Sequence, residues 1–71
     1  MSESIVLADN AITQHDRLVV ELHQPLEEPA FVLLQWRAQA SVLAADPRAV
    51  AAVARAVVRV LAAAQTKLAL S

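Results

Sequence analysis

The 71-residue chain has no cysteine, no glycine and only two aromatic residues, Phe31 and Trp36. The lack of cysteine excludes disulfides and thiolate metal sites, and two histidines, His15 and His23, cannot by themselves close a zinc site. The lack of glycine excludes a phosphate-cradling loop. Two aromatic residues make a poor stacking platform for single-stranded nucleic acid. We therefore expect no metal and no cofactor.

An excess of charge of one sign is also lacking, since six Lys and Arg residues stand against seven Asp and Glu residues. A generic nucleic-acid binder would be strongly basic. The N-terminus is acidic and resembles no secretory signal. The longest apolar run, residues 49–64, is interrupted by Arg55 and Arg59 and is shorter than the roughly 20 residues of a spanning helix. These features predict a cytoplasmic protein with no membrane association.

A chain of this length forms at most one domain, residues 1–71, near the lower size limit for independent folding. Small domains usually gain stability from disulfides, a metal or oligomerisation. Because the first two are excluded or unsupported, we expect a homodimer or higher oligomer.

The clearest local pattern begins at Asp46-Pro47. Asp is a favoured N-cap, and proline fits the next position because it needs no hydrogen-bond acceptor there. This pair predicts one long amphipathic helix over residues 46–70. At 100° per residue, Arg48, Arg55 and Arg59 lie on one face with Thr66. The opposite, apolar face would hold Val50, Val53, Val57, Leu61, Ala64 and Leu68.

Residues 1–45 are predicted to be strands and loops. Residues 17–23 alternate, with Leu18, Val20 and Leu22 on one face, as in a half-buried strand. Residues 30–36 are apolar on both faces, as in a central or interface strand. The segment from Pro25 to Pro29 would join these two strands into a β-hairpin, and residues 4–8 could add a first strand. The predicted fold is α+β: two or three N-terminal antiparallel strands, then one long C-terminal amphipathic helix.

The alternative is an all-α three-helix bundle. Apolar side chains and one histidine also recur at helical spacing in the first part of the chain, and Pro29 could start a helix running to Ala45. The β-branched pairs Ile5-Val6 and Val19-Val20 favour the strands.

The run from Phe31 to Trp36, followed by Asp46-Pro47-Arg48 and an Ala/Val/Arg helix, resembles small uncharacterised actinobacterial proteins. The resemblance covers roughly residues 17–68. It implies extended chain before a helix, although Arg37 and Ala38 depart from the prolines that tend to follow the tryptophan in that group. It implies no activity.

Few residues could carry chemistry. Asp16, Glu21, His15 and His23 are the only ingredients for an acid–base or metal site, and a catalytic metal generally needs three protein ligands. We interpret them as a solvated surface and expect no enzyme.

Arg48, Arg55 and Arg59 would extend about 16 Å along one helix face. They could contact phosphates or an acidic partner.

The apolar run suggests where the chain meets itself. One helix can cover only one face of the predicted sheet, so the other face would be free to form an oligomer interface. The candidate interface residues are Phe31, Leu33, Leu34 and Trp36.

The function that the sequence favours is a non-enzymatic, homo-oligomeric interaction or accessory protein. The alternatives are a nucleic-acid-binding regulator using the three arginines, and a small ligand-binding protein or enzyme with a site between subunits.

Overall fold

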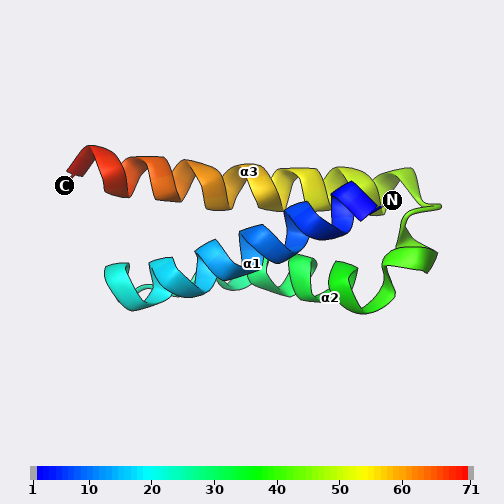
Figure 1. Cartoon of the computed structure of the whole chain (residues 1–71), viewed down its shortest axis with the longest axis horizontal. Helices are drawn as coiled ribbons and strands as arrows, with labels where there is room; N and C mark the ends of the chain where they lie inside the picture. The colour runs from blue at the N-terminus through cyan, green and yellow to red at the C-terminus, as the bar shows by residue number, and fades with distance from the viewer. Residues whose placement is uncertain (1, 71) are drawn as a thin grey trace.

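The computed structural model describes residues 2–70, with side chains described from Val6 onward. This part of the chain folds into three α-helices: α1 (Ser2–Leu22), α2 (Glu27–Leu43) and α3 (Pro47–Leu70). They lie side by side in an up-down-up bundle, so that α1 and α3 run parallel and α2 runs against them (Figure 1). Each helix contacts both of the others.

The prediction of an α+β fold is wrong. The described residues contain no strand, and the three predicted strand segments all lie in helices. The all-α three-helix bundle, kept as the alternative, describes the arrangement. The connection between α1 and α2 consists of His23, Gln24, Pro25 and Leu26. The β-hairpin loop was expected from Pro25 to Pro29, but Pro29 lies inside the first turn of α2.

The burial pattern of α1 shows why the strand prediction fails. Leu18 is 3% exposed and Leu22 is half-buried, but Val20, which alternation would place beside them, is 71% exposed. Residues at i and i+4 share a helix face, while residues at i and i+2 do not. Leu18 and Leu22 would share a face in a strand as well as in a helix. Only the exposure of Val20 distinguishes the helix from the strand.

The apolar run in α2 follows the same rule. Leu33 is 0% exposed and Trp36 is 2% exposed, three residues apart on the inner face. Leu34, next to Leu33 in sequence, is 53% exposed.

Proline is tolerated at position 29 of α2 because backbone N–H groups in the first turn have no intrahelical acceptor. Gln39 departs from helical geometry (φ −131°, ψ 31°) and marks a kink in α2.

The predicted start of the third helix is confirmed. The Arg48 backbone N–H donates to Asp46 Oδ1 at 3.0 Å, which is the N-cap bond expected of Asp46. Pro47 is the first residue of α3, and Lys67 lies in its last turn.

The apolar face predicted for α3 is rotated relative to the one it buries. The side chains of Val53, Ala56 and Val60 are the buried ones, whereas Val50 and Leu61 are 41% and 43% exposed. Ala56 and Val60 were not among the predicted core residues. Small side chains such as Ala56 let α3 approach both neighbouring helices closely, so the buried face turns towards α2. The core consists of Ala8, Ala11, Leu18, Leu33, Trp36, Val53, Ala56 and Val60.

Candidate functional site: the arginine face and the apolar α1/α3 face

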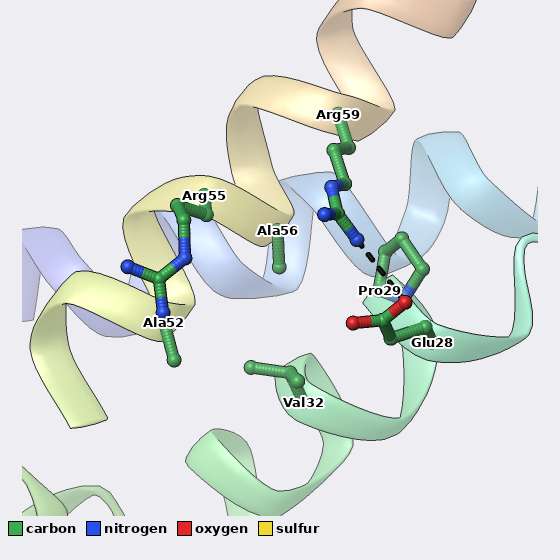
Figure 2. A pocket seen from close by; sticks show the side chains of 7 residues that line it. All are labelled: Glu28, Pro29, Val32, Ala52, Arg55, Ala56 and Arg59. Carbon is green, nitrogen blue, oxygen red and sulfur yellow. Dashed lines mark ion pairs between the residues drawn. The ribbon is translucent and has the colours of Figure 1, made fainter. Parts of the chain in front are cut away.

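The three arginines lie on α3: Arg55 and Arg59 border α2, and Arg48 is exposed in the first turn of the helix. Arg59 Nη1 lies 3.2 Å from Glu28 Oε2, at the start of α2. Among the described residues, Arg48 and Arg55 form no ion pair. Figure 2 shows Arg59 reaching across to Glu28, while the Arg55 side chain lies along α3 beside Ala52.

A small hollow opens between Arg55, Arg59 and Glu28. Its volume is about 70 Å³, and Pro29, Val32 and Ala56 form part of its wall (Figure 2). Pockets that hold drug-sized ligands are roughly 300–1,000 Å³. The hollow therefore has room for a few water molecules or a small anion.

The four predicted interface residues separate into two pairs. Leu33 and Trp36 belong to the core of the chain itself, while Phe31 and Leu34 are exposed, at 63% and 53%. Phe31 and Leu34 are three residues apart and share the outer face of α2. Leu33 and Leu34, adjacent in sequence, thus have different surroundings: Leu33 lies in the core and Leu34 on the outer face of α2.

The acid–base candidates do not converge on one site. Glu21 forms an ion pair with Lys67 of α3, and His23 is exposed and follows the end of α1. His15 is 8% exposed, with Nδ1 3.3 Å from Oδ1 of the neighbouring Asp16. Among the described residues, no group of three or more His, Asp or Glu side chains could hold a metal ion.

Four buried polar atoms have no hydrogen-bond partner within the described part of the chain. They are Asp9 Oδ1, Gln14 Oε1, His15 Nε2 and Trp36 Nε1. Asp9 Oδ1 does lie 3.1 Å from Arg37 Nε, so the two groups attract as charges without the alignment of a hydrogen bond. The four atoms belong to three residues of α1 and one residue of α2, and Gln14 and Trp36 line different grooves.

Charge is divided unequally among the helices. α3 carries Arg48, Arg55, Arg59 and Lys67 and no acidic residue, while most acidic residues are in α1 and α2. Two of the four cations, Arg59 and Lys67, meet acids of the neighbouring helices. Exposed pairs of this kind contribute about 0–1 kcal/mol each, so they orient α3 more than they stabilise it.

The sequence did not reveal a second surface, the apolar face shared by α1 and α3. Two open grooves run along it. One, of about 280 Å³, is lined by Leu7 of α1, by Trp36 and by Val50, Val57 and Val58 of α3. The other, of about 540 Å³, lies further along the two helices. Its apolar lining residues are Leu18, Leu61, Ala64 and Leu68, and its border also includes the charged side chains of Arg17, Glu21 and Lys67. We define these grooves and their apolar rims as the α1/α3 face.

By length and composition alone, α3 could also cross a membrane. Of its most apolar 18-residue window, 17% is buried in the bundle. Arg55 and Arg59 lie near the middle of the helix, where a charge is costly inside a bilayer.

Comparison with known protein families, with curated proteins and with solved structures gives no match.

Proposed function

We propose that this chain is a non-enzymatic protein-interaction module that works as a homo-oligomer. The observation that carries the proposal is the amount of large apolar side chain on the outside of so small a bundle. Leu7, Val58 and Leu61 on the α1/α3 face are 55%, 63% and 43% exposed, and Phe31 and Leu34 on α2 are 63% and 53% exposed. Contiguous apolar surface on a soluble protein usually marks an association surface.

The energetics support association. Eight apolar side chains are buried among those that the structure describes, and three of them are alanines, which contribute little hydrophobic free energy. Moving a Leu, Val or Phe side chain from water into an interface contributes about 1.5–3 kcal/mol. A few such residues would rival the whole stability of a small domain, about 5–15 kcal/mol. Oligomerisation is also the means of stabilisation left open by the lack of cysteine.

A non-enzymatic role is supported by how the polar groups are distributed. An active site needs acids, bases or nucleophiles that converge in a pocket. Here Glu21 pairs with Lys67, and the buried His15 contacts only its sequence neighbour Asp16 among polar side chains. The small hollow beside Arg55 and Arg59 contains no histidine and a single carboxylate.

A nucleic-acid-binding regulator is the second candidate, and the cationic composition of α3 favours it. Arg48 and Arg55 form no ion pair among the described residues and could reach phosphates. If they do, duplex DNA binding should weaken with salt by a slope of about 0.9 per phosphate contact, and replacing Arg48, Arg55 and Arg59 with Gln should flatten that slope. With a net charge of −1, we expect weak or no binding of the unmodified protein.

The proposal is tested by size-exclusion chromatography with light scattering at several concentrations, followed by native mass spectrometry. We expect a mass of at least twice 7.6 kDa and no retained small molecule. A protein that stays at 7.6 kDa at high micromolar concentration would contradict self-association. A retained ligand or metal would favour a binding protein or an enzyme.

A further inference from the structure

Two rows of residues, which we call seams, run side by side along helix α3. Within each seam, successive residues are alternately four and three positions apart in sequence. The inner seam faces the bundle and consists of Ala49, Val53, Ala56, Val60, Ala63 and Lys67. The outer seam is displaced by one residue and consists of Val50, Ala54, Val57, Leu61, Ala64 and Leu68. An apolar residue every 3.5 positions keeps a seam facing one partner helix. The inner seam has its partners in α1 and α2.

The outer seam has no comparable cover. Val50, Leu61 and Leu68 are 41%, 43% and 75% exposed, Ala54 is exposed, and Val57 and Ala64 are half-buried. All six residues are apolar. All six line the two grooves of the α1/α3 face: Val50, Ala54 and Val57 line one groove, and Leu61, Ala64 and Leu68 line the other. The seam extends for about 27 Å along the helix.

We propose that the outer seam of α3 packs against the same seam of a second copy, with the two α3 helices antiparallel. This inference rests on the proposed self-association and names the surface that performs it. A two-fold axis between the two helices, at the level of residue 59, would set Val57 opposite Leu61 of the other copy. It would also set Ala54 opposite Ala64, and Val50 opposite Leu68.

The order of side-chain sizes along the seam suits such a pairing. Read in either direction it runs large, small, large, large, small, large, so large residues meet large ones and each alanine meets an alanine. A two-fold interface requires this self-complementarity, because the same patch is used twice. The alanine layers permit close approach, and the Val and Leu layers fill the space between the helices.

The size of the face fits a dimer. The bundle measures 39 by 18 by 17 Å, so one long face presents on the order of 700 Å² in projection (39 × 18). Each partner contributes about 800 Å² to a standard protein interface. The α1/α3 face is therefore large enough only if most of its length is used, as a full-length antiparallel contact would do.

The antiparallel direction follows from the helix dipoles. A parallel pair would place equal helix ends beside each other, whereas the antiparallel pair opposes the two dipoles. Arg48, Arg55 and Arg59 lie on the far side of α3 from the seam, so the contact buries none of these three arginines. Arg17 and Glu21 of α1 and Lys67 of α3 line the second groove and border the contact.

The outer face of α2 is a weaker candidate for the same role. Phe31 and Leu34 are exposed there, but the kink at Gln39 interrupts the helix before Val42. A straight seam cannot continue past it. The exposed leucine of this face, Leu34, supplies a matched control.

Cysteine cross-linking tests the inference directly, because the chain has no cysteine of its own. Ala54→Cys and Ala64→Cys are prepared separately, then mixed, briefly unfolded, refolded together and oxidised. We expect a disulfide-linked dimer in the mixture and at least tenfold less in either variant alone, since a disulfide needs Cβ atoms about 3.5–4.5 Å apart. Equal cross-linking of Ala54→Cys with itself would overturn the antiparallel direction. No cross-linking in any sample would overturn the interface.

A second pair of variants separates the inference from the function on which it rests. Leu61→Lys should convert the oligomer to monomer by light scattering while keeping the helical circular dichroism spectrum, and Leu34→Lys should leave the mass unchanged. If Leu61→Lys remains oligomeric, the inference fails and the proposed self-association stands. If the unmodified protein is monomeric, both fail. A monomer that instead co-sediments with vesicles of anionic phospholipid would assign the seam to a lipid surface and overturn the inference.

Discussion

At the scale of single residues, Asp46 shows how far a local signal can be read. A capping carboxylate followed by proline predicts a helix start from sequence alone, and the bond from the Arg48 N–H to Asp46 Oδ1 confirms it. The signal is local, since both partners lie within three residues. It therefore does not depend on knowing the fold.

Replacing this cap should weaken the protein measurably. Asp46→Ala removes the acceptor of the Arg48 N–H and is expected to lower the free energy of unfolding by about 1 kcal/mol. Urea denaturation of both proteins at one concentration measures the difference. Asp46→Asn, which keeps the acceptor, is the control and should lose far less. An Asp46→Ala protein as stable as the original would show that the cap contributes nothing.

His23 is a second residue with a local consequence. It follows the end of α1 with φ of 55°, the left-handed conformation that glycine most often supplies after a helix. A non-glycine residue there costs roughly 1–2 kcal/mol. This chain has no glycine with which to avoid that cost.

We therefore expect His23→Gly to stabilise the protein, by up to about 1 kcal/mol. The β-branched substitution His23→Val should destabilise it, because such residues tolerate positive φ poorly. The melting temperatures of the three proteins test this order. The reverse order, with valine more stable than glycine, would mean that residue 23 is not left-handed in solution.

At the scale of helices, sequence alone predicted α3 and missed α1 and α2. β-branched pairs such as Val19-Val20 favour strands, but β propensity reflects packing context more than backbone preference. In α1, Val20 is exposed and Val19 is half-buried, on a helix that buries Leu18. Hydrophobicity along the apolar run of α2 shows no clear period, because the run combines core residues with the exposed Phe31 and Leu34. Such a run fits a buried strand or a helix equally well.

The rotation of α3 is the more instructive error. The predicted apolar face held Val53 together with Val50, Val57 and Leu61. The bundle buries Val53 as predicted, but with Ala56 and Val60 on the neighbouring seam. The sequence contained both seams. Only the positions of α1 and α2 decide which seam is covered, and one sequence does not give those positions.

A pair of substitutions on α3 tests this assignment. Val60→Asp places a carboxylate in the core, where Val60 is 0% exposed, and should prevent folding. Val58→Asp, two residues earlier and 63% exposed, should leave the chain folded. Circular dichroism at 222 nm and urea denaturation report the outcome. Equal damage from both substitutions would show that a different face of α3 is buried.

At the scale of the whole molecule, the arginines and the apolar residues of α3 have different surroundings. Arg59 and Lys67 hold α3 against acids of α2 and α1, while the outer seam, about 27 Å long, remains outside the bundle. The arginine face could be predicted from the sequence. The exposed seam could not, because the larger apolar side chains had been assigned to the core.

The dependence of thermal unfolding on protein concentration tests the central claim, self-association of the folded chain, most directly. If the oligomer is the stable form, mass action makes the melting temperature rise as the chain is concentrated. We expect a steady rise between low and high micromolar concentration for the unmodified protein and for Leu34→Lys. A melting temperature that stays constant over that range, in a protein whose mass remains that of one chain, would contradict the account.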